Sequence, residues 1–436
     1  MQIAPSLAGP MLGALEFLSS YPYGCTEQTL SSFVPNLLVQ RALADLKLPP
    51  TEKLKSLDRQ VSDGLKRIYD YQHEDGGWGW WKTDENQPFM TAYAVYGLLE
   101  AKNTGYRVDE YRLEQGARQL KKLYANYPTA VPELKAYITH VLVLAETRGV
   151  EATDYSDDPR WERDAALNEL WAAKDRMSSY GQALLLLALN DRKDARGDEL
   201  ARQLLGGVQR KGELAWWKAD NDPLLDDWAD TSVEATAMAV RALAGREAKN
   251  PVLEQAVRWM LLNRTFGWYW GSTKQTAMAL YGLLDYMKAR GETAADSDVT
   301  VFVNGASVGT TKLTGAALTA PDPIEFTVAA RDGQNAVKVV TRGAGAVYWA
   351  AQAVYYDTAA AQERTGSRKL ALERQYFTLT PVTVKDRIVY RETPFAGTAN
   401  PGDILLVRLT TAGSADWRYL MIEDPLPAGV EPIQQE

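Results

Sequence analysis

Apolar residues recur at three- and four-residue spacing from Leu7 to about Arg290. This period places them along one face of an α-helix. Glycine, proline and polar clusters interrupt the pattern and mark the ends of successive helices. The pattern predicts twelve helices, at about residues 7–19, 27–45, 53–71, 89–103, 109–126, 131–148, 161–173, 178–190, 196–209, 231–245, 251–263 and 272–289.

One helix start carries a specific capping signal. Thr231 and Glu234 have the spacing of a capping box, with Thr231 as the N-cap and Glu234 at the third helical position. We therefore expect both side chains to bond the backbone at the start of this helix.

An aromatic loop followed by a helix rich in alanine and glycine occurs three times. The loops are residues 77–81, 214–217 and 267–270, and the helices that follow them contain residues 91–99, 236–243 and 276–284. Repeated helical hairpins stack on one another. Twelve helices in six hairpins predict a closed α/α toroid. An open α-solenoid is the alternative, and the bulky aromatic loops favour closure.

After Gly291 the pattern changes to the alternation of β-strands. Residues 299–303 alternate, and Asn304-Gly305 is a strong hairpin signal. The fold class is therefore multidomain, an α/α toroid of about twelve helices followed by two β-sandwich-type segments. Four strands per segment leave open edges, so we expect the first and last domains to be incomplete. Further strands are predicted at 324–329, 336–341 and 347–356, and, after a linker at 358–368, at 370–379, 387–391, 404–410 and 419–423.

Composition excludes several classes of function. The net charge is −8 and the pI about 5.2, without a basic stripe, so nucleic acid is a poor candidate partner. No apolar stretch approaches the ~20 residues that span a bilayer. The residues after Met1 do not form a signal peptide, so we expect a cytosolic chain or a piece of a longer one. A single cysteine excludes internal disulfides.

That cysteine, Cys25, precedes Gln28 by three residues. If Cys25 begins a helix, its sulfur and the Gln28 amide project from the same face. The thiol can then displace ammonia and close an internal thioester. We expect the helix N-terminus to lower the thiol pKa, and the neighbouring Tyr21 and Tyr23 to shield the bond from water.

The spacing alone is a weak pattern, and an inert buried cysteine is the usual alternative. Nucleophilic cysteine catalysis would require a base. His73 lies in a polar loop, and His140 lies on a predicted helix, where a structural role is more common. The acidic residues 226–230 resemble a solvated loop more than a metal site. No cofactor motif or zinc spacing is present, so we predict neither a cofactor nor a metal.

The stretches Pro5–Gly9 and Tyr21–Thr29 resemble the thioester motif of bacterial alpha-2-macroglobulins. The motif is similar to the Gly-Cys-Gly-Glu-Gln of animal relatives and complement proteins, with Thr26 in place of the second glycine. The resemblance covers the whole chain. It implies a thioester domain (an α/α toroid) at residues 1–290, the second half of a CUB-like β domain at 298–357, and the start of the C-terminal macroglobulin-like β domain at 370–436.

This resemblance implies a protease inhibitor of bacterial defence rather than an enzyme. A protease cuts a bait region, the molecule rearranges, and the exposed thioester couples once to a lysine amine of the protease. Cys25 and Gln28 would form that crosslink. The resemblance also implies a periplasmic lipoprotein parent anchored to the inner membrane, and we expect a monomer. Complement relatives use a histidine in acyl transfer, and the sequence leaves open whether His140 does so.

Two other functions remain open from the residues alone. The chain could be a toroid enzyme of the terpene cyclase or glycosidase type, whose repeats it superficially resembles. It could also be an adhesion or scaffold module with an inert cysteine.

Overall fold

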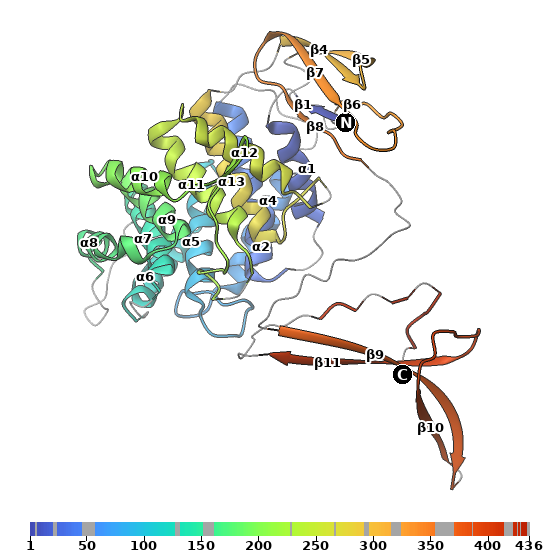
Figure 1. Cartoon of the computed structure of the whole chain (residues 1–436). Helices are drawn as coiled ribbons and strands as arrows, with labels where there is room; N and C mark the ends of the chain where they lie inside the picture. The colour runs from blue at the N-terminus through green and yellow to red at the C-terminus, as the bar shows by residue number, and fades with distance from the viewer. Residues whose placement is uncertain are drawn as a thin grey trace. The chain divides into compact units, whose positions relative to one another are not determined.

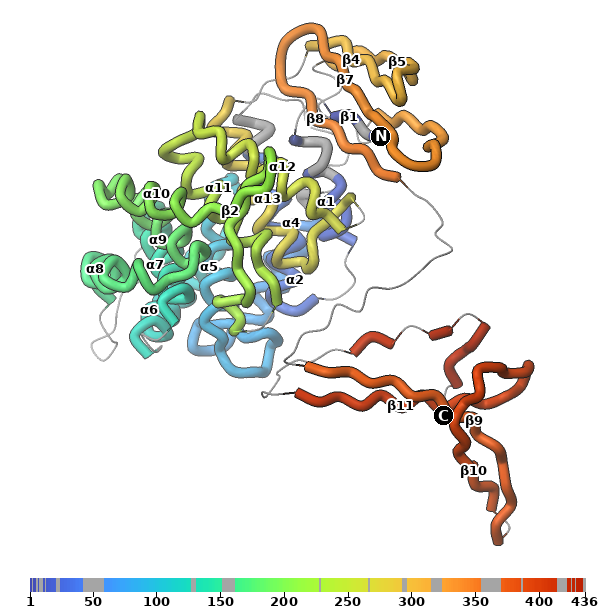
Figure 2. Tube along the Cα trace, in the orientation of Figure 1, coloured from blue at the N-terminus to red at the C-terminus, as the bar shows by residue number. Residues whose placement is uncertain are grey.

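The computed structural model describes residues 1–4, 7–20, 24–45, 57–126, 131–150, 161–226, 229–265, 267–291, 296–314, 324–353, 370–385, 387–413, 422–424, 426–427 and 429–433. The chain divides into two compact units, Met1–Ala353 and Val354–Glu436. All the helices belong to the first unit (Figure 1), and the trace in Figure 2 follows them around a common centre.

The described residues contain twelve α-helices, arranged as an inner and an outer ring. Each inner helix packs against the next, and α13 packs against α2, so the ring closes and the predicted α/α toroid is confirmed. The inner helices are α2 (Thr26–Asp45), α5 (Pro88–Asn103), α7 (Pro132–Thr147), α9 (Ser179–Asp191), α11 (Ser232–Glu247) and α13 (Thr273–Arg290). The outer helices are α1 (Ala8–Ser20), α4 (Leu57–Tyr71), α6 (Glu110–Asn126), α8 (Arg163–Ala173), α10 (Arg196–Gly206) and α12 (Pro251–Leu262).

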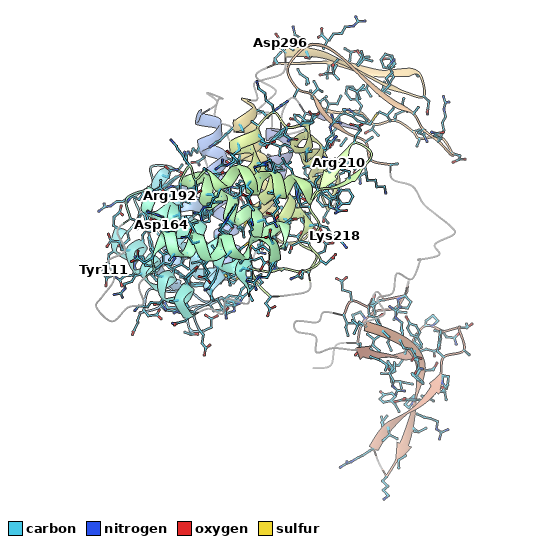
Figure 3. The ribbon with its side chains drawn as sticks, turned by 60° about the vertical axis from the view of Figure 1, so that its left-hand side comes forward. Tyr111, Asp164, Arg192, Arg210, Lys218 and Asp296 are labelled. Atoms are coloured by element: carbon cyan, nitrogen blue, oxygen red, sulfur yellow. The ribbon has the colours of Figure 1, made fainter. Side chains whose placement is uncertain are left out.

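The two rings follow from the composition of their helices. In the inner helix α9 every residue from Tyr180 to Leu189 is buried, as expected for a helix that is apolar on all sides. In the outer helix α10 only Gly197, Leu200, Ala201 and Leu204 are buried. Outer helices expose their other face, as Tyr111 of α6 shows at the edge of the helical unit (Figure 3).

Each of the three sequence repeats places a fully buried tryptophan between two helices. Its backbone N–H donates to the threonine of the following inner helix at 3.0 Å in all three. Its indole N–H donates to a carbonyl of the preceding outer helix at 2.7–2.8 Å. The repeat therefore joins each outer helix to its inner neighbour. The tryptophan–threonine pairs are Trp78–Thr91, Trp217–Thr236 and Trp270–Thr276, and the outer carbonyls belong to Ile68, Leu204 and Met260.

Contacts between first turns show the relative direction of four inner helices, α2, α9, α11 and α13. Thr273, the first residue of α13, donates to Glu27 in the first turn of α2. Tyr180, Glu234 and Lys274 belong to the first turns of α9, α11 and α13, and they form one hydrogen-bonded group. The N-termini of these four helices therefore lie at the same end of the toroid.

A three-stranded antiparallel sheet follows the toroid in the chain. It has the order β5-β4-β7, built from β4 (Asp296–Val303), β5 (Ala306–Leu313) and β7 (Val337–Ala344). Asn304 and Gly305 have φ angles of 50° and 83°. Two positive φ angles are typical of a type I′ turn, and the predicted hairpin is confirmed.

A second sheet uses the start of the chain. Its order is β6-β1-β8, with β6 (Ile324–Glu325), β1 (Gln2–Ala4) and β8 (Tyr348–Ala350). β1 was not predicted, because three residues are too few to show an alternation. The pairing joins residues 2–4 to strands that follow the toroid.

Three antiparallel strands in the order β10-β9-β11 form the second unit: β9 (Leu370–Val384), β10 (Arg387–Pro394) and β11 (Ile404–Gly413). They lie where strands were predicted. The strand expected at 419–423 falls mostly outside the described residues, and Ile422 and Glu423 are not in a strand. Two short strands, β2 (Gln209–Lys211) and β3 (Leu214–Trp216), and the 3-10 turn Lys174–Arg176 belong to the toroid.

Candidate functional site

Cys25 directly precedes α2, and Gln28 is the third residue of that helix. The N–H of Gln28 donates to Sγ of Cys25 at 3.4 Å. The N–H of Cys25 donates to Oε1 of Gln28 at 3.3 Å. This reciprocal pair has the form of a capping box in which sulfur replaces a hydroxyl oxygen. The backbone of α2 thus holds the thiol and the amide at the same end of the helix.

The loop that precedes α5 is hydrogen-bonded to the first turn of α2. The Trp80 carbonyl accepts from the N–H of Thr26 at 2.9 Å and from its hydroxyl at 3.2 Å. Asp84 in turn accepts from the N–H groups of Trp80 and Trp81 at 2.7 and 3.1 Å. The Thr26 N–H has no partner within the helix, so this contact satisfies it and fixes the turn beside Cys25.

The Cys25 side chain is only 4% exposed. Burial raises the pKa of its thiol to about 11, and the hydrogen bond from the Gln28 N–H lowers it by less. The expectation that the helix N-terminus favours a thiolate is therefore wrong, because desolvation of the charged form outweighs it. The site favours an uncharged sulfur, and the sulfur of a thioester is uncharged.

Glu27 lies between the two predicted site residues and is also buried. Its Oε1 accepts from the Ser31 hydroxyl at 2.6 Å. The Thr273 hydroxyl lies 3.0 and 2.8 Å from Oε1 and Oε2. Burial raises the pKa of the Glu27 carboxyl, against the effect of these hydrogen bonds and of Lys274. Sequence reasoning missed this contact, because nothing local connects Glu27 to a helix so far along the chain.

A buried charge cluster lies at the same end of the inner helices. Nζ of Lys274 donates to Asp222 at 2.5 Å and to Glu234 at 2.7 Å, and Tyr180 donates to Glu234 at 2.8 Å. The predicted capping box of Thr231 and Glu234 is therefore wrong. Thr231 is the N-cap, but its side chain makes no capping bond, and the buried lysine binds the glutamate more strongly than a backbone N–H can.

In the part of the chain that the structure describes, neither histidine is hydrogen-bonded to Cys25. Nδ1 of His73 lies 2.7 Å from Oδ1 of Asn86, within the loop that fastens α2. His140 is buried in α7, with Nδ1 at 3.2 Å from Asp191, the last residue of α9. His140 thus lies at the level where the inner helix α9 ends, away from the first turns of the inner helices.

Several other predicted residues are outside the described part of the chain. Tyr21 and Tyr23, expected to shield the site, fall there, as do residues 227 and 228 of the acidic stretch. Asp230 of the same stretch accepts from the Ser232 N–H at 2.8 Å. Within the described ranges, no cluster of three histidine, cysteine or acidic side chains is arranged to hold a metal. No helix described in the structure is long and apolar enough to cross a bilayer.

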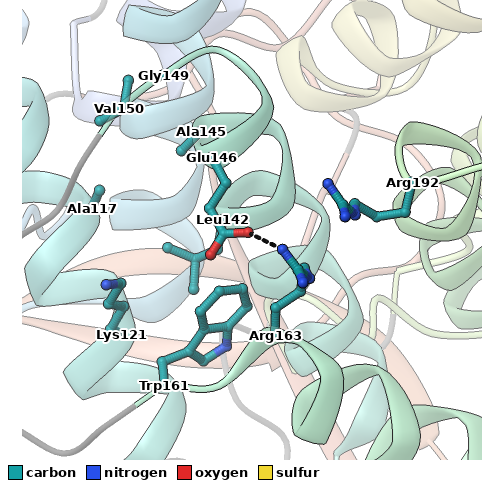
Figure 4. A pocket seen from close by; sticks show the side chains of 10 residues that line it. All are labelled: Ala117, Lys121, Leu142, Ala145, Glu146, Gly149, Val150, Trp161, Arg163 and Arg192. Atoms are coloured by element: carbon teal, nitrogen blue, oxygen red, sulfur yellow. Dashed lines mark hydrogen bonds and ion pairs between the residues drawn. The ribbon is translucent and has the colours of Figure 1, made fainter.

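A cavity of about 410 Å³ lies elsewhere on the toroid, against the C-terminal half of α7 (Figure 4). Trp161 and Leu142 line it, and Arg163 and Glu146 pair across its side at 3.2 Å. No residue of the Cys25 site lines this cavity. It therefore contributes nothing to the chemistry of Cys25 and Gln28.

Residues 5–123 match the family model of the A-macroglobulin TED domain, and residues 370–436 match that of the bacterial alpha-2-macroglobulin MG10 domain. In these two segments the chain is similar to bacterial alpha-2-macroglobulins. The first match contains Cys25 and Gln28 and begins just before α1. The second coincides with the start of β9.

Curated relatives show the same similarity. The alpha-2-macroglobulin of Thermotoga maritima is 30% identical over 275 residues, which are 63% of this chain and 14% of that protein. The Escherichia coli alpha-2-macroglobulin is 29% identical over 215 residues, 46% of this chain and 12% of that protein. The chain thus spans less than a sixth of the length of these relatives.

Solved structures show the same fold. A Salmonella alpha-2-macroglobulin reacted with methylamine matches with a TM-score of 0.50 at 20% identity, over 94% of this chain and 24% of that one. The native E. coli alpha-2-macroglobulin matches with a TM-score of 0.50 at 18% identity, over 86% and 22%. These matches show that the chain shares the fold of these two proteins.

Proposed function

We propose that Cys25 and Gln28 form an internal thioester, and that this bond is the covalent trap of a protease inhibitor. The reciprocal hydrogen bonds between the two residues carry the proposal, because each ties one side chain to the backbone N–H of the other residue at the same end of α2. Sγ adds to Cδ of Gln28, the C–N bond breaks, and ammonia leaves with the thiol proton. The carbonyl carbon of the thioester is an electrophile that persists until a nucleophile attacks it.

A lysine amine of a protease then attacks the same carbonyl carbon. The new amide joins the two proteins, and Cys25 leaves with a proton as a free thiol. Burial of Cys25 supports the first stage, since it keeps water from the stored thioester until the site is exposed to the protease. Because the bond is consumed, the protein acts once and does not turn over. We extend the proposal to a monomeric, periplasmic parent protein anchored to the inner membrane, as the family resemblance implies.

Intact-mass measurement and thiol titration of the freshly purified chain test this proposal. We expect a mass lower than the sequence mass by one ammonia, and no titratable thiol. Methylamine should then add its own mass and release one thiol per chain.

Two variants are matched controls for this measurement. Cys25→Ser removes the nucleophile, and Gln28→Glu keeps the shape of the acceptor side chain but replaces its amide. Both should show the full sequence mass and no reaction with methylamine. A wild-type chain at full sequence mass, with a thiol that titrates from the start, would overturn the proposal.

A further inference from the structure

Glu27 is a buried acid whose carboxylate joins two helices at the ring closure. Ser31, one turn further along α2, supplies one hydroxyl at 2.6 Å. Thr273, the first residue of α13, supplies the other at 2.8 and 3.0 Å. α13 is the last inner helix and α2 the first, so this contact closes the ring at the end that carries Cys25.

The position of Glu27 in the helix determines what this contact controls. Glu27 projects about 100° around the helix from Gln28 and lies further still from Cys25. Its side chain therefore faces α13, while the thiol and the amide occupy another face. Because Thr273 of α13 holds the Glu27 carboxylate, it sets the rotation of the first turn of α2. That rotation determines the direction in which the Cys25 and Gln28 side chains project.

We propose that Thr273, acting through Glu27, is a positioning residue that keeps Cys25 and Gln28 together and their bond dry. The proposal rests on the thioester proposed above. Without the Thr273 hydroxyl, the buried carboxylate keeps the Ser31 hydroxyl as its one donor among the described residues. A buried acceptor that loses its donor either binds a water molecule that enters the site or moves toward the solvent. Either response loosens the first turn of α2 and admits water to the thioester.

The test compares Thr273→Val with Thr273→Ser in the full chain. Valine keeps the shape of threonine and removes the hydroxyl, whereas serine keeps the hydroxyl. We expect the valine variant to release its thiol about tenfold faster in buffer, which corresponds to one lost hydrogen bond to a charged group. The serine variant should release its thiol at the wild-type rate.

Thr236→Val is the matched control. Thr236 is also a buried threonine of an inner helix, and its hydroxyl contacts the backbone N–H and carbonyl of Trp217 at 3.0 and 3.4 Å. It makes no contact with Glu27 in the structure. Its loss should lower the melting temperature as much as Thr273→Val does, with no change in thiol release. Equal rates of thiol release in the two valine variants, or no rescue by serine, would overturn the proposal.

Amide hydrogen exchange over residues 24–31 separates this proposal from the thioester itself. Exchange there should be faster in Thr273→Val than in Thr236→Val, whether or not the bond has formed. A wild-type chain without a thioester would contradict the proposed function. The exchange rates would still test the contact between Thr273 and Glu27. If Thr273→Val does not fold, Ser31→Ala provides a second variant. It removes the donor within α2 and should speed thiol release less than tenfold, and an unchanged exchange rate in it would count against the proposal.

Discussion

The hydroxyls of Tyr93 and Tyr281 meet at 3.0 Å in the middle of the toroid, although the residues are 188 positions apart in the chain. Tyr93 also lies 3.1 Å from Ser31, which donates to Glu27. A continuous line of hydrogen bonds therefore runs from the first turn of α2 across the ring to α13.

We expect Tyr281→Phe to lower the free energy of unfolding by about 1 kcal/mol, because it removes one buried hydrogen bond while Tyr93 keeps Ser31 as a partner. Denaturant unfolding measures this change. Tyr111→Phe is the control, since the Tyr111 side chain is 68% exposed. An equal loss in both variants would show that the buried pair contributes nothing.

Trp217 should be among the most sensitive residues of the toroid. Trp217→Phe removes the indole N–H that donates to Leu204 at 2.7 Å and leaves a gap where the larger ring packed. We expect a loss of about 2–4 kcal/mol, from the cavity and the lost hydrogen bond together. The measurement is again denaturant unfolding.

Trp81→Phe is the matched control for that substitution. Trp81 is 54% exposed and belongs to the aromatic loop of another repeat. Its replacement should change the free energy of unfolding by no more than about 0.5 kcal/mol. Comparable losses in the two variants would contradict the structural role assigned to the repeated buried tryptophan.

Much of the toroid could be predicted from the sequence because its signals are local. Helix periods and breaks placed all twelve helices, and the tryptophan–threonine repeat indicated that they belong to similar hairpins. That Cys25 and Gln28 share one end of α2 was also predictable, since three residues of helix determine this geometry, whereas the thioester between them stays a prediction. The shielding assigned to Tyr21 and Tyr23 stays a prediction.

The features that could not be predicted from the sequence depend on contacts between distant segments. Glu27 and Thr273 are 246 positions apart, and no local pattern in the sequence indicates their hydrogen bond. The capping box at Thr231 failed for the same reason, because Lys274 arrives from another helix and binds Glu234. The thiol pKa was misjudged because the helix terminus is visible in the sequence, whereas burial of Cys25 is not.

The pH dependence of stability should report the buried cluster. Burial raises the pKa of Glu234 from 4.5 to about 7, against the attraction of Lys274. Between these values the folded chain keeps a proton that the unfolded chain has released, so stability falls as the pH rises through this window. Glu234→Gln keeps an acceptor for Tyr180 and Lys274 but cannot titrate, and it should flatten the fall in melting temperature between about pH 5 and about pH 8.

Glu254→Gln is the control for the pH experiment. Glu254 lies on the outer helix α12 and is paired at the surface with Arg258, so its removal should leave the pH profile unchanged. A profile for Glu234→Gln that parallels the wild type would show that another group causes the fall.

His140 should take no part in acyl transfer. It is the ninth residue of α7, beside Asp191 at the end of α9 and with its ring 6.5 Å from that of Tyr96, the ninth residue of α5. Eight helical steps of 1.5 Å separate this level from the first turns, about 12 Å along the axis. A base must lie within hydrogen-bond reach of the group that it serves.

We therefore expect His140→Asn to react with methylamine at a rate within about twofold of the wild type, as measured by thiol release, whereas loss of a general base costs roughly a hundredfold or more. The melting temperature of the variant, taken in the same buffer, distinguishes a slower reaction from partial unfolding. A hundredfold slower release from a chain that melts like the wild type would assign His140 to the reaction, and would require the ring to open so that the histidine reaches Cys25.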